Sequence, residues 1–200
     1  MTFSPATEER LRHGFRRYLN PFMVLLWRLG LGRWFNAWPD VGGQIMVIVH
    51  TGRKTGARRL SPVNYALAEG DVYALAGFGR VSDWYLNLRA DPEVELWLPE
   101  GRWRAVAEDV SEDPRRLQLV RQVMIASGFA ARVFGLDPRP MSDLELARVT
   151  ARYPLLRFRR TEALTGPGGP GDLAWVWLVL AAVWMFGRMV NARRARRRRS

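Results

Sequence analysis

The sequence predicts an α+β protein in which a small antiparallel β-barrel carries helices on its surface. Short segments with the apolar runs or the alternation typical of strands recur between residues 44 and 110. Tight turns join most of these segments, whereas parallel strands need a longer crossover. Helical segments with capping signals follow, before one last alternating run near residue 155. This order has no βαβ repeat, so it argues against a doubly wound nucleotide-binding fold and favours a barrel.

The first 36 residues are expected to be helical and amphipathic. Ser4 and Pro5, followed by two glutamates, have the arrangement of a helix start. An apolar stripe then runs between arginines, and it consists of Leu11, Phe15, Tyr18 and Leu19. Asn20–Leu31 is expected to form a second helical piece. A segment of this kind either lies on anionic lipid or covers the mouth of the barrel, and both interpretations stay open.

Six segments have the strand pattern, and tight turns join three pairs of them. The expected strands are Gln44–His50, Arg59–Ala68, Val72–Ala76, Glu93–Leu98, Arg102–Val110 and Leu155–Arg160. The turns are Thr51–Gly56, Glu69–Asp71 and Pro99–Gly101. Pro62 has no backbone N–H to give to a β-ladder, which predicts a sheet edge or a bulge at that position.

Three helices are expected among and after these strands. They are Asp83–Ala90 with Ser82 as its cap, a helix from Ser111 and Pro114 to about Ala126, and a helix that begins at Ser142. Asp91 precedes a proline, and this position disfavours helical backbone, so the first helix is expected to end there. Ser142 and Glu145 have the spacing of a capping box.

The residues from 165 onward are expected to form a linker, an apolar helix and a basic tail. Residues 165–171 read TGPGGPG, residues 172–190 hold fifteen consecutive uncharged residues (Leu173–Gly187), and residues 191–200 are rich in arginine. As a helix, the uncharged stretch rises about 22 Å, less than the ~30 Å hydrocarbon core. We expect it to be a membrane anchor that holds the chain on the cytoplasmic side. A transmembrane helix and a helix inserted in one leaflet both stay open.

Charge and composition exclude several classes of function. The net charge is +12, but seven arginines after residue 187 leave only +5 for the rest, so we expect an anionic membrane surface rather than nucleic acid as a partner. The chain has no cysteine and two histidines, His13 and His50, which argues against thiolate or His-rich metal sites. Either histidine is expected to be a packing or surface residue, and no metal site is expected.

Hydrolytic and nucleotide-binding signatures are incomplete in this chain. Arg53 stands where a Walker A loop needs its second glycine, and Gly77-Phe78-Gly79 lacks the third glycine of a dinucleotide fingerprint. No Ser-His-Asp arrangement or pair of carboxylates stands out. The chemistry is therefore expected to be that of a bound cofactor.

The turn between the first two strands concentrates positive charge. His50–Arg59 reads HTGRKTGARR, and Lys54 is the only lysine among 31 Lys and Arg residues. Gly52 and Gly56 allow backbone N–H groups to form an anion-binding nest, beside a guanidinium that can bind phosphate with two hydrogen bonds. The alternative is a solvated loop without a ligand. Strand alternation sends only one of Arg58 and Arg59 to a given face.

Two stretches together resemble the deazaflavin-dependent nitroreductase family. They are HTGRKTGARRLSP at His50–Pro62 and DWYLNLRADP at Asp83–Pro92. Members of this family are flavin/deazaflavin oxidoreductases with a split β-barrel of the FMN-binding-like type. The resemblance therefore implies that residues 37–164 form a split-barrel domain that binds a deazaflavin.

The resemblance implies coenzyme F420, a deazaflavin with a phosphate and a polyglutamate tail, as the cofactor. The residues expected to line its site are Gly52, Arg53, Lys54, Thr55, Gly56, Arg59, Ser61, Pro62, Ala76, Gly77, Gly79, Arg80, Trp84 and Asn87. Trp84 would close the site by packing and Asn87 by hydrogen bonding, and Arg80 would meet the phosphate. Several cations suit such an anionic tail.

The resemblance also implies hydride transfer from the reduced cofactor to a small-molecule electron acceptor, either a quinone or a nitroaromatic. Ser61, Asn64 and Tyr65 are the candidate catalytic residues, which would give a proton or hydrogen bond to the developing anion. Family members often carry an aromatic residue where this chain has Asn64. A barrel that binds FMN or haem stays open as an alternative, as does a non-enzymatic module that binds anionic lipid or nucleic acid.

Overall fold

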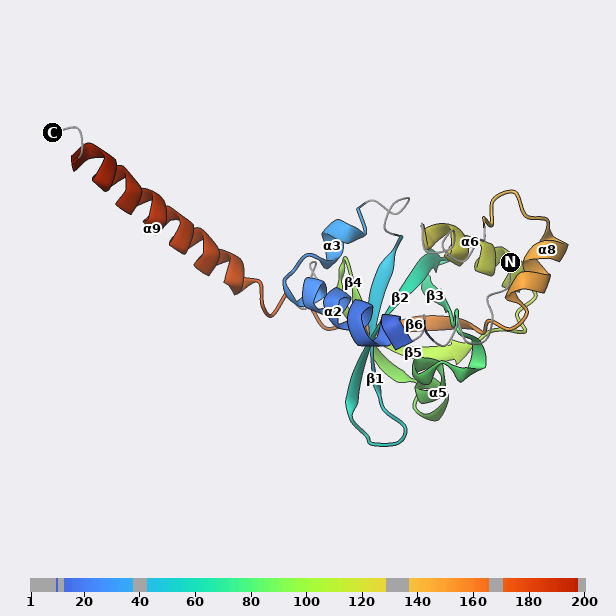
Figure 1. The fold of residues 1–200 in the computed structure, drawn as a ribbon. Coiled ribbons are helices and arrows are strands. Elements are labelled where there is room, and N and C mark those ends of the chain that lie inside the picture. Colours follow the sequence, from blue (N-terminus) through green and yellow to red (C-terminus); the bar gives the residue numbers. More distant parts are fainter. Residues whose placement is uncertain (1–9, 11–12, 38–42, 129–136, 166–170, 198–200) are drawn as a thin grey trace.

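Six strands form a closed antiparallel barrel in the computed structural model, which describes residues 10, 13–37, 43–128, 137–165 and 171–197. The strands are β1 Ile45–Thr51, β2 Arg58–Ala68, β3 Asp71–Leu75, β4 Glu93–Leu98, β5 Gly101–Asp109 and β6 Leu155–Ala163. Their order around the barrel is β1-β2-β3-β6-β5-β4 (Figure 1). This architecture confirms the predicted α+β fold and its split barrel.

The pairing of β2 explains why the barrel accepts a proline in this strand. β2 pairs with β1 along Arg58–Asn64 and with β3 along Tyr65–Ala68. Pro62 therefore lies where β2 has a single ladder partner, opposite Val47 of β1. The predicted sheet edge at Pro62 is confirmed, because the side of β2 without a partner needs no N–H donor there.

The described helices surround the barrel or extend from it. Their bounds are η1 Phe15–Leu19, α2 Asn20–Arg28, α3 Gly32–Phe35, η2 Gly79–Val81, α5 Asp83–Ala90, α6 Arg116–Ala126, α8 Asp143–Thr150 and α9 Trp175–Arg197. The capping box of α8 is confirmed, since the Glu145 N–H donates to Ser142 Oγ at 3.3 Å and the Ser142 N–H donates to Glu145 Oε2 at 2.9 Å. The predicted helix from Ser111 begins later, at Arg116, after turns around Asp113.

The barrel interior is the main hydrophobic core. It is lined by fully buried side chains from several strands, among them Met46, Ile48, Leu96 and Phe158. α5 contributes Tyr85 and Leu88 to the same core. This shared core fixes α5 against the barrel, so the polar residues of α5 are held in a defined position beside the strands.

Two further apolar clusters attach helices to the outside of the barrel. α6 and α8 pack on β2 and β3 through Val120, Val123 and Leu146. α2 packs through Trp27 against Val47 of β1 and Trp97 of β4. α2 therefore covers the barrel wall. That the preceding amphipathic piece covers the barrel mouth stays a prediction, because residues 1–9 and 11–12 lie outside the described residues.

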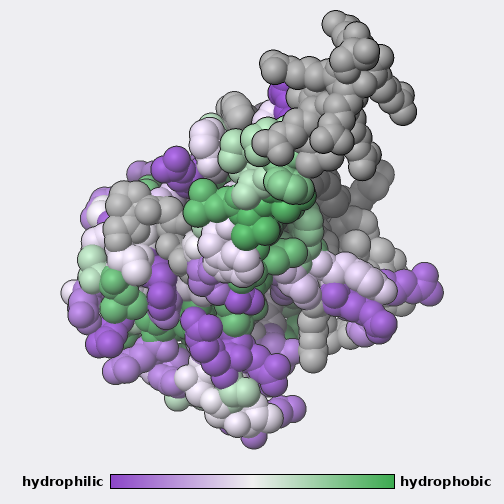
Figure 2. Space-filling view, turned by 90° about the vertical axis from the view of Figure 1, so that its left-hand side faces the viewer, coloured by the Kyte–Doolittle hydropathy of each residue, from purple (hydrophilic) through white to green (hydrophobic). Residues whose placement is uncertain are grey.

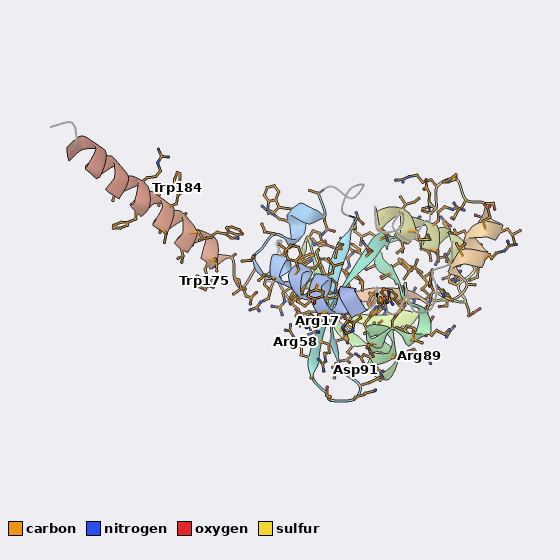
Figure 3. All side chains as sticks on the ribbon, in the orientation of Figure 1. Arg17, Arg58, Arg89, Asp91, Trp175 and Trp184 are labelled. Carbon is orange, nitrogen blue, oxygen red and sulfur yellow. The ribbon has the colours of Figure 1, made fainter. Side chains whose placement is uncertain are left out.

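α9 extends away from the barrel (Figures 1 and 3), and among the described residues its contacts with the body lie at its root, residues 172–177. The Leu173 N–H donates to the Arg28 carbonyl at 2.9 Å, and the Arg28 guanidinium forms an ion pair with Asp172 at 2.7 Å. The Trp177 indole N–H donates to the Leu29 carbonyl at 2.9 Å. The root of α9 is thus tied to the C-terminal end of α2.

The interpretation of residues 172–190 as a transmembrane anchor is wrong. Within the described ranges, no helix has both the length and the apolar character that crossing a bilayer requires. α9 is helical as expected, but Arg188 ends its uncharged stretch, and the residues beyond carry more arginines. The apolar part alone is shorter than a bilayer core.

Exposed apolar side chains nevertheless cover α9. Trp175, Trp184 and Phe186 are each more than half exposed. Figure 2 shows a large green area near the middle of this face and smaller green areas among the purple and white atoms, and in Figure 3 Trp175 and Trp184 lie along α9. The predicted helix start at Ser4-Pro5, Leu11 of the apolar stripe, linker residues 166–170 and the last three residues of the tail lie outside the described residues.

Candidate functional site

The β1–β2 loop uses its backbone donors within itself. The Gly52 carbonyl accepts from the N–H groups of Thr55 at 3.1 Å and Gly56 at 2.8 Å, and the Gly52 N–H donates to the Ala57 carbonyl at 2.8 Å. Gly56 adopts φ +65°, which a side chain would disfavour. These bonds stabilise a rigid turn and leave few N–H groups for an anion. The expected backbone nest is therefore wrong, and an anion at this loop would depend on side chains.

Arg53 fastens this loop to α5. Asn87 Oδ1 accepts from the Arg53 backbone N–H at 3.2 Å and from its Nη1 at 2.9 Å. The same guanidinium forms an ion pair with Asp83 at 3.3 Å. Arg53 is therefore held by two residues of the first turns of α5, and its charge is partly balanced by Asp83.

The two neighbouring arginines of β2 point to opposite faces. Arg58 pairs with Glu95 at 3.7 Å and lies over the ring of Trp97 at 5.9 Å, on the outside of the barrel. Figure 3 labels Arg58 near the loop end of β2. Arg59 lies on the other face, where its charge acts on His50. This confirms the prediction that alternation sends only one of the pair to a given face.

Two cations at the loop have no ion-pair partner within the described chain. They are Lys54 and Arg59, and both are exposed. Arg59 Nε lies about 3.4 Å from where a side chain on Gly52 would begin, so the guanidinium passes close over the loop. The loop thus presents two unpaired positive charges beside Arg53, which is itself bound to Asn87 and Asp83.

A buried hydrogen-bond network lies beneath these cations. His50 is 4% exposed; its Nε2 is 3.0 Å from Ser61 Oγ, and its Nδ1 is 3.3 Å from Asn87 Nδ2. Burial lowers the pKa of His50, the Thr51 backbone opposes this shift, and the Arg59 charge lowers it further. The imidazole is therefore neutral at pH 7. We call His50, Arg53, Ser61, Asp83 and Asn87 the loop–α5 junction.

The glycine-containing loop after β3 leads directly into α5. Gly79 is buried at φ +72°, and its N–H donates to the Ala76 carbonyl at 2.7 Å. A side chain on Gly79 would begin 3.1 Å from the Arg152 carbonyl, so the residue allows a close backbone approach. Gly77 and Arg80 are exposed. Burial raises the pKa of the Asp109 carboxyl, but hydrogen bonds from Ser111 and Tyr85 outweigh it and hold that pKa below its usual range, with the Arg80 charge as a smaller contribution. The structure shows no contact between Arg80 and the described β1–β2 loop cations.

The three candidate catalytic residues do not gather at one point. Ser61 belongs to the loop–α5 junction. Asn64 lies on the opposite face of β2, where its amide donates to the Gln44 carbonyl at 3.2 Å. Tyr65 is 2% exposed inside the barrel core, and burial raises its pKa, with the Glu100 charge as the second cause. Of the three, Ser61 is the one placed beside the loop cations.

Trp84 and Pro62, two other predicted site residues, lie in different surroundings. Trp84 is half-buried and packs against the barrel core from α5. Pro62 shares the outer face of β2 with Asn64 by strand alternation. His50 and Asp83 belong to the loop–α5 junction but were not among the predicted site residues. The local signal for His50 was its place at the end of an apolar strand, directly before the cationic loop.

The chain matches known proteins in its central part. The family model for F420H(2)-dependent quinone reductase matches residues 30–137, more than half of the 200-residue chain. The matched stretch contains the β1–β2 loop, the glycine-containing loop and α5.

The solved structures that match this chain have low sequence identity. The conserved hypothetical protein Rv2991 from Mycobacterium tuberculosis is 22% identical, with 60% of this chain and 73% of that chain covered and a TM-score of 0.42. HutZ, the heme storage protein from Vibrio cholerae, is 14% identical over 69% and 94%, with a TM-score of 0.46. A structure described as an F420 reductase is 14% identical over 64% and 93%, with a TM-score of 0.42.

Proposed function

Because this chain belongs to the F420H(2)-dependent quinone reductase family, we propose that it binds reduced coenzyme F420 at the β1–β2 loop and reduces a quinone. The observation that carries this proposal is the pair of unpaired cations, Lys54 and Arg59, on a loop that Arg53 links to Asn87 of α5. Lys54, Arg59 and the partly balanced Arg53 together raise the positive potential at this turn, and such a potential attracts an anionic ligand.

The residues present fit the chemistry of this cofactor. Its tail carries a phosphate and carboxylates, and Lys54 and Arg59 offer a compact ammonium and a guanidinium fork for such groups. Arg53 would add a partly balanced charge, and its bonds to Asn87 keep the loop rigid before the ligand arrives. Arg80 and the backbone of Ala76–Gly79 would form the second wall of the site.

The protein's part in the reaction is to orient and to exclude water. When bound, the reduced deazaflavin supplies a hydride and a proton, so that the quinone gains two electrons and two protons and leaves as a hydroquinone. Trp84 would shield the ring from solvent, and the Ser61 hydroxyl would hydrogen-bond to the ring or to the acceptor. A rigid, prearranged donor costs no reorganisation when charge develops.

Fluorescence titration of the full chain with F420 tests this proposal. We expect saturable binding, and about three- to tenfold weaker binding for Lys54→Ala and for Arg59→Ala, the loss of one exposed charge-assisted contact. Arg58→Ala is the matched control, because Arg58 pairs with Glu95 on the outer face and should leave the affinity unchanged. Tight binding of FMN or haem, with none of F420, would contradict the proposal.

Turnover with different acceptors tests the substrate class. We expect reduced F420 to be oxidised faster with a quinone than with a nitroaromatic compound of similar reduction potential. The opposite order would assign the nitroaromatic class to this site.

We also propose that α9 holds the chain at an anionic membrane surface without crossing it. Apolar side chains of α9 are exposed between Trp175 and Met189, and the sequence after Gly187 is rich in arginine. The ties between Arg28 and Asp172 and between Trp177 and Leu29 fix the root of the helix to the body. A lipid-soluble quinone would be close to an enzyme held in this way.

Sedimentation with vesicles tests the membrane proposal. The full chain should bind phosphatidylglycerol vesicles more strongly than phosphatidylcholine vesicles. Trp184→Ala with Phe186→Ala should weaken this binding, whereas Trp34→Ala, at a tryptophan outside α9 that is also more than half exposed, should not. Equal losses for both variants, or no binding, would contradict it.

A further inference from the structure

The orientation of the Asn87 side chain is determined by its neighbours. Two N–H donors of Arg53, the backbone N–H and Nη1, both point at Asn87 Oδ1. The reverse orientation would place the amide NH₂ against two donors, which is unfavourable. Asn87 Oδ1 therefore faces Arg53, and Asn87 Nδ2 faces His50.

This orientation decides the tautomer of His50. Asn87 Nδ2 can only donate, so His50 Nδ1, 3.3 Å away, must accept. The ring is buried and neutral, and its single proton then lies on Nε2. Nε2 is 3.0 Å from Ser61 Oγ, so the ring N–H donates to the serine oxygen.

The hydroxyl proton of Ser61 stays available for a further hydrogen bond. Its oxygen accepts from His50, and within the described residues its hydroxyl proton has no acceptor. Ser61 is half-buried on the same face of β2 as Arg59. A hydroxyl whose lone pair is occupied by a fixed donor directs its proton elsewhere, here toward the space beside the loop cations.

We infer that Arg53, Asn87 and His50 form a positioning relay that makes Ser61 a dedicated hydrogen-bond donor to the ring of the bound ligand. The acceptor is an oxygen or nitrogen atom of a cofactor or quinone ring. This inference rests on the proposed function for the nature of the ligand. The relay itself is a property of the protein alone. His50 acts through Ser61 and does not touch the ligand.

The tautomer can be measured without any ligand. The chain has only two histidines, so the ring nitrogens of His50 can be assigned in ¹⁵N NMR spectra by comparison with a His13→Gln variant. We expect the protonated nitrogen of His50 to be Nε2. A proton on Nδ1, donated for example to the nearby Thr51 carbonyl, would overturn the relay whatever cofactor the protein binds.

Four variants test the function of the relay. Ser61→Ala should lower F420 affinity or quinone turnover about fivefold, the loss of one neutral hydrogen bond. His50→Phe should have a smaller effect of about two- to threefold, because the serine hydroxyl can then rotate. His50→Gln should recover most of the loss, since its amide can donate to Ser61 Oγ. Ser61→Thr, which keeps the hydroxyl, should stay near the parent protein.

The double variant Ser61→Ala with His50→Phe separates the relay from a merely structural role. If His50 acts through Ser61, the double variant should behave like Ser61→Ala alone. Additive losses would overturn the relay, as would failure of His50→Gln to recover function in a folded protein. If His50→Phe fails to fold, the His50 tautomer measured by NMR and the comparison of Ser61→Ala with Ser61→Thr still test the relay. If the His50 proton lies on Nε2 but the protein does not bind F420, the proposed function is refuted and the relay is not.

Discussion

Replacing Asn87 by alanine should destabilise the fold, because the hydrogen bonds of its side-chain amide to Arg53 and His50 are lost. Asn87 is 6% exposed, and its amide makes two hydrogen bonds to Arg53 and one to His50. A hydrogen bond contributes about 1 kcal/mol net. The Arg53 guanidinium can regain water, whereas His50 Nδ1 stays buried without its donor. We therefore expect the free energy of unfolding to fall by about 2 kcal/mol, loosening the β1–β2 loop.

Urea unfolding followed by tryptophan fluorescence measures this loss. Asn64→Ala is the matched control, because it deletes the same amide from a half-buried residue with one hydrogen bond, to the Gln44 carbonyl. We expect that control to lose about 1 kcal/mol or less. If Asn87→Ala lost no more than Asn64→Ala, the reasoning that Asn87 holds the loop against α5 would be refuted.

Two further predictions concern stability elsewhere in the barrel. Gly43 has φ +75°, and a side chain there would begin 2.6 Å from the Ser127 carbonyl oxygen, so Gly43→Ala should cost about 2 kcal/mol or more. Gly77→Ala, which meets open space, should leave the melting temperature nearly unchanged. Hydrogen bonds from Arg157, and secondly from Arg159, hold the pKa of Glu108 below its usual range. That stability is present above the unfolded pKa of about 4.3 and is lost as pH falls through the folded pKa, so Glu108→Gln should make the decline in unfolding free energy below about pH 4 shallower. An unchanged acid slope would contradict this assignment.

The strands were predictable because their signals are local. Apolar alternation and turn residues placed β4 at its observed bounds and β1, β2 and β3 to within one residue at each end. β6 runs to Ala163, three residues further than expected, because it pairs with β5 beyond a register shift at Arg104/Ala105. That extension depends on a partner strand far away in the sequence.

The site was predictable only in part, because some of its contacts join residues that are far apart in the sequence. Alternation correctly separated Arg58 from Arg59, and the lone Lys54 stands unpaired within the described structure. The role of His50 depends on Asn87, 37 residues later on α5, which no local pattern reveals. The backbone nest failed because the loop closes its own hydrogen bonds around Gly52.

C-terminal composition predicted a helix but not its relation to lipid. Fifteen uncharged residues suit a helix, and α9 forms. Whether such a helix crosses a bilayer depends on its apolar length, and the arginines from Arg188 onward limit that length.

The central claim is that this chain transfers reducing equivalents from F420 held at the β1–β2 loop to a quinone. Anaerobic mixing of the full chain with reduced F420 and a water-soluble quinone, followed by the recovery of oxidised F420, measures this transfer directly. We predict oxidation well above the protein-free rate, with Lys54→Ala/Arg59→Ala needing more cofactor for half-maximal rate and Arg58→Ala unchanged. A folded parent protein that oxidises reduced F420 no faster than buffer would contradict the account.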